Sequence, residues 1–194
     1  MEKHLNLSRY KELLKLEESG KMEVFNENFL ELLTYTASVV EQIKYNRKND
    51  YFLLIHQYLS RVIPPYEFRV QFLQMEKEDS NKGAILLEDF QELEIFTLAE
   101  DLEKFADFIN QISTLCFEYA EIWDGTMERM SKDEFYYLVN NLYLQLQKAF
   151  PFNIWEIFSN NPAYKDLVSR SFKFLIFTIG LEILLILFTI RTIN

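Results

Sequence analysis

The sequence predicts a mainly α-helical protein, with a small antiparallel β-unit at about residues 66–96 and one C-terminal transmembrane helix. Glycine and proline number four each, against 18 Phe and 11 Tyr, and this composition favours long helices over a many-stranded β-fold. Apolar residues recur every three or four positions in several segments, as on the buried face of a helix. We therefore expect an acidic cytosolic helical domain at 1–160. A juxtamembrane and transmembrane segment follows at 161–194, with its span at about 173–191.

Two helices are expected at residues 7–18 and 27–46. Gly20 follows the first and is typical of a helix end. Asn26 precedes the second, where an amide side chain can cap the free N–H groups. The apolar positions of the second helix are Phe29, Leu32, Leu33, Thr36, Val40 and Ile43.

A third helix is expected at residues 51–63, separated from the second by the polar run at 46–50. Asp50 is its predicted N-cap. Pro64 and Pro65 are expected to stop it, because proline removes a hydrogen-bond donor and restricts the residue before it.

The apolar pattern then changes to a period of two, which indicates a strand with one buried face. The alternating residues are Tyr66, Phe68, Val70 and Phe72. Residues 76–83 are interpreted as a polar loop, and 84–88 and 91–96 as further strands of the β-unit. A helix through 87–96 is the competing interpretation.

Two capping-box sequences predict two more helices. Thr97 and Glu100 begin the first, whose apolar stripe consists of Leu98, Leu102, Phe105, Ile109, Ile112, Cys116 and Tyr119. Ser131 and Glu134 begin the second, which runs to about residue 149 before Pro151. Its inward positions are Phe135, Leu138, Val139, Leu142 and Leu146. Asp124 and Gly125 predict a turn between the two helices.

Phe174–Ile190 is a run of seventeen residues with one charge, Glu182. At about 1.5 Å per residue it covers about 25 Å of a bilayer core about 30 Å thick. Asn161 and Pro162 are expected to begin the helix that continues through this run. A buried C-terminal helix of a soluble protein is the alternative, but such a helix normally keeps a broad polar face, whereas the polar side chains of this run are only Thr178, Glu182 and Thr189.

The polar side chains of this predicted span fall on one stripe of the helix. They are Ser171, Thr178, Glu182 and Thr189. A carboxylate in the membrane is costly unless it is protonated or paired, and helices in lipid associate through such polar faces. We therefore expect a homo-oligomer. A lone anchor with a protonated Glu182, or a small polar path across the membrane, are the alternatives.

Basic residues predict the orientation of the span. Lys165, Arg170 and Lys173 precede it and Arg191 follows it, which places the N-terminal domain in the cytoplasm by the positive-inside rule. The N-terminus is charged throughout and lacks the apolar core of a signal peptide. Cys116 is the only cysteine, as expected in a reducing compartment.

The net charge of the predicted domain limits the classes of partner that it is expected to bind. Two of the 30 acidic and four of the 20 basic residues lie in 161–194, so the preceding domain has a net charge of −12. Such a surface repels nucleic-acid backbones, so no nucleic-acid partner is expected. The expected partners are membrane lipid, further copies of the chain and a protein. Tyr136, Tyr137 and Tyr143 give the 131–149 helix more aromatic surface than one core stripe needs, which favours a protein interface.

No motif indicates catalysis. The sequence contains no HExxH, CxxC, GxxxxGK[ST], GxGxxG or GxSxG. HEPN-type RNases use an arginine followed by four to six residues and a histidine, but residues 49–51 are Asn, Asp and Tyr, so His56 cannot complete that motif. We interpret His56 and Cys116 as structural, and the acidic pairs near Glu88, Glu100 and Glu118 as solvated helix faces. No catalytic residue, metal or cofactor is therefore expected.

The leading functional hypothesis is a single-pass, tail-anchored membrane protein that acts as a non-enzymatic, oligomeric interaction or sensing module. One alternative is a pore-forming or membrane-perturbing effector of a defence or toxin-type system, which Glu182 and its neighbouring hydroxyl groups motivate. The other is a membrane-tethered enzyme of unknown class.

Overall fold

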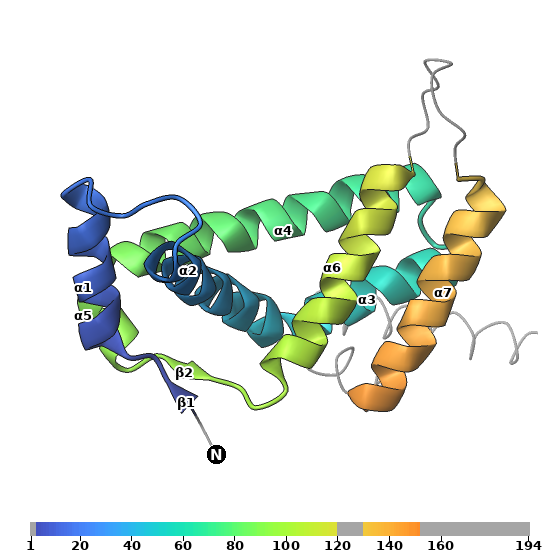
Figure 1. The fold of residues 1–194 in the computed structure, drawn as a ribbon. Coiled ribbons are helices and arrows are strands. Elements are labelled where there is room, and N and C mark those ends of the chain that lie inside the picture. Colours follow the sequence, from blue (N-terminus) through green and yellow to red (C-terminus); the bar gives the residue numbers. More distant parts are fainter. Residues whose placement is uncertain (1–2, 120–129, 152–194) are drawn as a thin grey trace, which may run out of the picture. The chain divides into compact units, whose positions relative to one another are not determined.

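Seven helices and two short strands make up the described part of the computed structural model, residues 3–119 and 130–151 (Figure 1). The elements are β1 (Lys3–His4), α1 (Leu7–Glu18), α2 (Glu27–Asn46), α3 (Lys48–Leu59), α4 (Pro65–Glu88), α5 (Phe90–Glu94), β2 (Thr97–Leu98), α6 (Leu102–Glu118) and α7 (Lys132–Ala149). The prediction of a mainly α-helical domain is confirmed.

Within those two ranges, no helix combines the length and the apolar character needed to cross a membrane. The predicted span at 173–191 lies outside the described residues, as do the predicted turn at Asp124 and Gly125 and the helix start at Pro162.

Helices α1 and α2 have the predicted bounds. The side chain of Asn6 caps α1 by accepting a hydrogen bond from the N–H of Arg9 at 3.2 Å. Asn26 caps α2 in the same way, from the N–H of Phe29 at 2.8 Å. These local bonds satisfy donors that have no partner within the helix, so the sequence was sufficient to place both starts.

Gly20 ends α1 in a Schellman motif. The N–H of Gly20 donates to the carbonyl of Glu17 and the N–H of Lys21 to the carbonyl of Leu16. The motif requires a left-handed residue, and Gly20 has a φ of +67°. Glycine adopts this conformation at little cost because it has no Cβ.

Helix α3 begins three residues before the predicted start, and the prediction of Asp50 as its N-cap is wrong. Arg47 alone separates α2 from α3, and its N–H still donates to carbonyls at the end of α2. The polar run therefore interrupts the helical conformation only at Arg47. The side chain of Arg47 pairs with Asp50 at 3.3 Å, within the first turn of α3.

The end of α3 also differs from the prediction. The helix stops at Leu59, before the prolines, because Arg61 takes a left-handed conformation with a φ of +59°. Pro65 is the first residue of α4, a position that suits proline because its missing N–H would have no partner there. The prolines therefore begin a helix instead of ending one.

The predicted β-unit at 66–96 is wrong, because these residues form α4 and α5. Alternation misled the prediction: Phe68 and Phe72 are four residues apart and share the buried helix face, while Tyr66 and Val70 are half exposed. The polar stretch at 76–83 continues α4, because Asp79 and Gly83 extend the same buried face. The competing interpretation of a helix at 87–96 was closer, since α5 occupies 90–94.

The predicted capping box at Thr97 is also wrong. Thr97 pairs with His4, and Leu98 with Lys3, in the antiparallel ladder of β1 and β2. The backbone of Thr97 and Leu98 is extended for this strand pairing and cannot be helical at the same time, so α6 begins only at Leu102.

The rest of the α6 and α7 prediction is confirmed. All seven residues of the predicted stripe from Leu98 to Tyr119 are buried. Ser131 and Glu134 form the predicted capping box, and α7 ends at Ala149. Of its predicted inward residues, Phe135, Val139 and Leu146 are buried, and Leu138 and Leu142 are partly buried.

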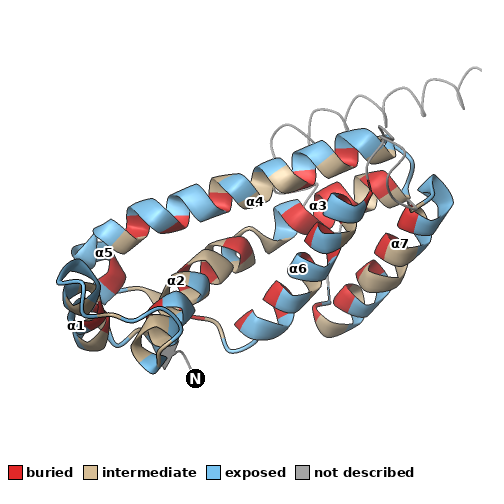
Figure 2. Ribbon diagram, turned by 45° about the horizontal axis from the view of Figure 1, so that its top comes forward, coloured by how far each residue is buried: buried red, intermediate tan, exposed pale blue. Residues whose placement is uncertain are grey.

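Among the described residues, two apolar groups form the core, and α4 contributes to both. Figure 2 shows buried segments recurring along the length of α4. The first apolar cluster joins α1, α2, α4 and α5 and contains Tyr10, Leu13, Leu32, Val39, Leu86 and Leu93. The aromatic cluster joins α3, α4, α6 and α7 and contains Tyr51, Tyr58, Phe68, Phe72, Phe105, Tyr119 and Phe135. Within it, Tyr58 stacks on Phe68 and Tyr119 on Phe135, each with ring centroids 4.5 Å apart. Each buried aromatic ring stabilises the fold by about 1.5–3 kcal/mol.

Helices α2 and α4 approach closely at Gly83, and substitution of this glycine tests that packing. A Cβ at position 83 would lie 2.5 Å from Cγ2 of Val40. Although alanine normally stabilises a helix relative to glycine, we expect Gly83→Ala to lower the free energy of unfolding by about 1–3 kcal/mol, because the valine side chain is stiff. Urea denaturation followed by far-ultraviolet circular dichroism measures the change.

Adding Val40→Ala to Gly83→Ala should recover part of the loss, because it removes the contacting methyl group. Asn81→Ala, at an exposed position of α4, is the matched control and should leave the midpoint of unfolding nearly unchanged. Equal stability of Gly83→Ala and the natural protein would contradict the close approach.

Candidate functional site

The site residues predicted from the tail lie outside the described residues. They are the polar stripe of Ser171, Thr178, Glu182 and Thr189, and the orienting residues Lys165, Arg170 and Lys173. Both assignments therefore stay predictions. The described domain contains three polar groupings, which differ in how fully their charges are paired.

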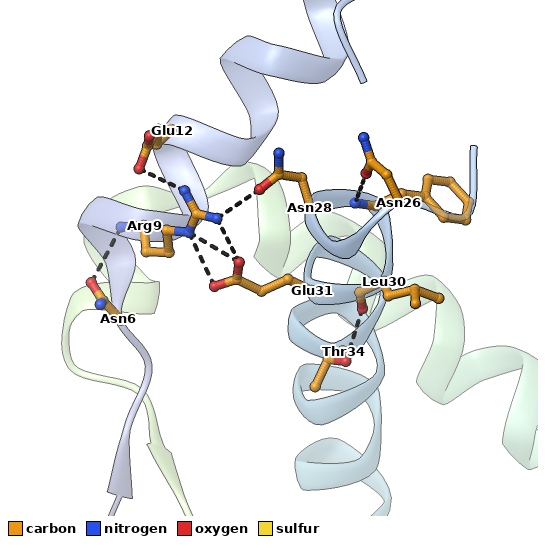
Figure 3. Close-up of polar contacts among 9 residues, drawn as sticks. Asn6, Arg9, Glu12, Asn26, Asn28, Leu30, Glu31 and Thr34 are labelled. Atoms are coloured by element: carbon orange, nitrogen blue, oxygen red, sulfur yellow. Dashed lines mark hydrogen bonds and ion pairs between the residues drawn. The ribbon is translucent and has the colours of Figure 1, made fainter. Parts of the chain in front are cut away.

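The first grouping joins α1 to α2 through Arg9 (Figure 3). Its guanidinium donates to the carboxylate of Glu31 at 2.7–3.1 Å, to Glu12 at 2.9 Å and to the amide oxygen of Asn28 at 2.8 Å. The hydrogen bond from Arg9 holds the pKa of Glu31 below its usual value. The donors of Arg9 are directed to oxygens of its own chain, so this grouping is structural.

The second grouping is buried between α2, α4 and α6. Lys44 is 7% exposed, and its ammonium group donates to Glu76 at 2.6 Å and to the amide oxygen of Asn110 at 3.3 Å. The other carboxylate oxygen of Glu76 accepts a hydrogen bond from the hydroxyl of Ser113. Burial of this ion pair is tolerated because each charge has partners.

Asp79 extends this buried grouping to α3. Its side chain is fully buried; one oxygen accepts from Arg47 at 2.6 Å and the other from the hydroxyl of Tyr51 at 2.7 Å. Burial and the neighbouring Asp79 raise the pKa of Tyr51 well above its usual value, so the phenol stays a donor. Because both carboxylate oxygens are used, the arrangement braces the helices and offers no free group to a substrate.

The acidic residues do not assemble a metal site in the part of the chain that the structure describes. Asp89 instead caps α5, accepting hydrogen bonds from the N–H groups of Gln91 and Glu92 at 3.0 and 3.1 Å. It therefore has a structural role.

Cys116 and His56 have the structural surroundings that the sequence predicted. Cys116 is fully buried, and burial raises the pKa of its thiol, which disfavours the nucleophilic thiolate. One ring nitrogen of His56 lies 3.5 Å from the hydroxyl of Tyr143 and the other 3.2 Å from the hydroxyl of Ser60. Burial lowers the pKa of His56, so the neutral imidazole is favoured.

The three tyrosines predicted to mark an interface have different surroundings. Tyr137 is exposed as predicted. The prediction is wrong for Tyr143, which is buried because its ring packs edge-on against Phe52. Tyr136 is partly buried, and its hydroxyl donates to the carbonyl of Leu59 at 2.9 Å.

The third grouping lines an open cleft of about 440 Å³ between the α3–α4 turn and the start of α7. Arg61 and Lys132 bring two positive charges to it, while Asp133 is the only carboxylate among the described residues that line it. The guanidinium of Arg61 lies over the ring of Tyr136, 5.7 Å from its centroid. Among the described residues, neither Arg61 nor Lys132 has an ion-pair partner.

Unusual features surround this cleft. Arg61 has a left-handed backbone, which costs a residue other than glycine about 1 kcal/mol or more. Tyr58 lines the cleft, and its buried hydroxyl has no hydrogen-bond partner among the described residues. Pro64 precedes α4 as its N-cap residue and makes no side-chain cap, and together with Pro65 it places the start of this helix at the cleft.

Sequence reasoning missed this cleft. It singled out neither Arg61 nor Lys132, because no motif joins residues from a turn and a distant helix start. The available signal was Pro65 at the start of a helix, directly after an arginine-containing turn.

Comparison with known proteins finds no matching family model, no matching curated protein and no matching solved structure. The roles assigned to these residues therefore depend on their own contacts, burial and charge. Of the three groupings, the cleft combines unpaired cations with open space, and it is the candidate functional site.

Substitutions at Asp79 test the bracing role of the buried grouping. Tyr51→Phe removes one hydrogen bond and should lower the free energy of unfolding by about 1 kcal/mol. Asp79→Leu leaves Arg47 and Tyr51 without their buried partner and should cost about 3 kcal/mol, the lower part of the usual range, because the Arg47 side chain is 23% exposed.

Chemical denaturation measures both variants, and their double mutant should be less destabilised than the sum because the two residues share one bond. Tyr137→Phe is the control at an exposed tyrosine and should change little. If Asp79→Leu were as stable as the natural protein, the bracing role would be wrong.

Reactivity of the single thiol tests the placement of Cys116. We expect Ellman's reagent to react slowly or not at all with the folded chain, because the thiol is buried and its pKa is raised. In denaturant, one thiol per chain should react at once, since the sequence contains one cysteine. Rapid labelling of the folded protein would contradict the packing of α6.

Proposed function

We propose that this chain is a single-pass, tail-anchored membrane protein that self-associates and presents its acidic helical domain to the cytosol as a non-enzymatic interaction or sensing module. The observation that carries the proposal is the run Phe174–Ile190, which is apolar around its whole circumference apart from Thr178, Glu182 and Thr189. The basic residues before the run support the cytosolic side, as does the reduced state expected for Cys116.

Self-association is supported by the polar stripe around Glu182. A carboxyl group in the membrane is least costly when it meets a donor on a neighbouring helix, and the hydroxyls of Thr178 and Thr189 share its face. The same stripe favours the second candidate function, an effector whose associated tail helices open a polar path through the bilayer.

An exposed apolar group on the domain supports a role in interaction. Val24 and Phe25 precede α2, and Leu30 and Leu33 lie one turn apart on its solvent side. Phe25 is 79% exposed, and its ring contacts only the edge of Phe29 among the aromatic pairs of the described residues, at 5.9 Å. Large apolar side chains grouped in this way are a common mark of protein-binding surfaces.

Membrane extraction tests the tether. The full chain should stay with the membrane pellet in alkaline carbonate and enter solution only with detergent. Replacing Leu184 and Leu185 together by Arg should release it, because two charges at mid-span oppose insertion. A chain that washes off in carbonate and is soluble without detergent would rule out the anchor.

The mass of the detergent-solubilised particle tests association, as a separate measurement. We expect a multiple of the mass of one chain, a shift towards one chain for Glu182→Leu, and retention of the oligomer for Glu182→Gln, whose amide can still form a hydrogen bond across helices. Dye release from vesicles by the natural chain, lost in Glu182→Leu, would favour the effector over the module. An unchanged particle mass in Glu182→Leu would contradict association through the stripe.

A further inference from the structure

We propose that the cleft between the α3–α4 turn and the start of α7 binds a phosphate group, carried either by a lipid headgroup or by a free phosphate compound. The inference does not depend on the membrane tether, because the cleft belongs entirely to the described domain.

The first support is a contrast with the other three arginines of the described residues, all of which are held by oxygens of the chain. Arg9 and Arg47 form ion pairs with carboxylates, and Arg69 donates to the carbonyl of Cys116 at 2.7 Å. In a molecule with a net charge of −10, nearby carboxylates are abundant. Arg61 nevertheless faces the ring of Tyr136 and no carboxylate of the described residues. A guanidinium held in this way stays available for an oxyanion.

The second support is the conformation that holds Arg61. Its N–H donates to the carbonyl of Tyr58 and the N–H of Val62 to that of Gln57, both at 2.9 Å, which is the Schellman motif. The same motif ends α1, where its left-handed position is occupied by Gly20. Arginine occupies the corresponding position in α3 although glycine would fit it without strain. The backbone conformation alone would favour glycine at position 61, so we attribute the presence of arginine there to a role of its side chain.

The third support is the inner wall of the cleft. The Tyr58 side chain is only 2% exposed, and its hydroxyl has no hydrogen-bond partner among the described residues. Burial raises the pKa of this phenol, so it stays protonated and can donate. A buried donor without a partner is costly to the fold. The Tyr58 hydroxyl is closed off from solvent, so a ligand oxygen would satisfy it once the side chains of the wall shift.

The chemistry of the ligand follows from the number and spacing of the positive groups. Arg61 and Lys132 come from different elements, and the start of α4 at Pro64 and Pro65 adds the positive end of the helix dipole. Several positive groups around one opening suit the oxygens of a phosphate better than a single carboxylate. The cleft volume of about 440 Å³ lies in the range of small-ligand sites, so it also has room for the group that carries the phosphate.

Thermal unfolding of the full chain in mild detergent tests the proposal, with pyrophosphate as the probe. We expect pyrophosphate to raise the unfolding midpoint of the natural chain. Potassium chloride at the same ionic strength should give a lower midpoint than pyrophosphate does. Arg61→Gln should weaken pyrophosphate binding at least tenfold, and Lys132→Gln should weaken it less. Lys82→Gln removes an exposed charge of α4 about 25 Å along the helix from the cleft and should bind as the natural chain does.

Arg61→Gly separates binding from folding. Without a probe this variant should unfold at a higher temperature than the natural chain, because glycine suits the left-handed position, yet it should lose the shift with pyrophosphate. Retention of the full shift in either Arg61 variant would overturn the proposal. A shift that potassium chloride reproduces would overturn it as well.

A second arm distinguishes the source of the phosphate. The chain is placed in lipid nanodiscs of phosphatidylcholine, with or without phosphatidic acid. A midpoint raised by phosphatidic acid and lost in Arg61→Gln indicates a lipid headgroup, and a shift with pyrophosphate alone indicates a free compound. No shift dependent on Arg61 in either arm would overturn the proposal, while carbonate extraction would still report on the tether.

Discussion

Two ion pairs, Lys44 of α2 with Glu76 and Arg47 at the α2–α3 junction with Asp79, attach this part of the chain to α4 between the first apolar cluster and the aromatic cluster. On α4, Glu76 and Asp79 come after the phenylalanines of the aromatic cluster and before Leu86 of the first apolar cluster. Buried charges are costly without partners, so α2 and α4 must keep this register for the pairs to form. Apolar contacts alone would tolerate small displacements, whereas paired charges at 2.6 Å do not.

The same pairs explain why part of the fold was predictable and part was not. Helices α1, α2 and α7 begin with side-chain caps, which are local and can be recognised in the sequence. Helix α4 has no such cap. In its polar central stretch at 76–83, Glu76 pairs with Lys44, and Glu78 and Asp79 pair with Arg47, while Lys77, Ser80, Asn81 and Lys82 are exposed. Polar residues that serve a buried ion pair look like a loop until their partners, more than thirty positions away, are known.

The candidate site was unpredictable for a related reason. A left-handed helix end is normally signalled by glycine, as at Gly20, and Arg61 removes that signal while adopting the same conformation. Lys132 is an ordinary first-turn residue in the sequence, and only the packing of α7 against α3 brings it beside Arg61. Tyr58 belongs to a clear apolar stripe, which gives no indication that its hydroxyl is unpartnered.

The domain is acidic overall, so binding of an anion in the cleft depends on how far each charge of the domain lies from the ligand. Charges in water are screened over about 8 Å at physiological ionic strength, so a ligand inside the cleft experiences Arg61 and Lys132 more strongly than the distant carboxylates. A long polyanion such as a nucleic acid would extend beyond the cleft and meet the acidic surface, where repulsion opposes binding. For the proposed site, the negative charge of the domain would therefore oppose an extended phosphate backbone more strongly than a small phosphate group at the cationic opening.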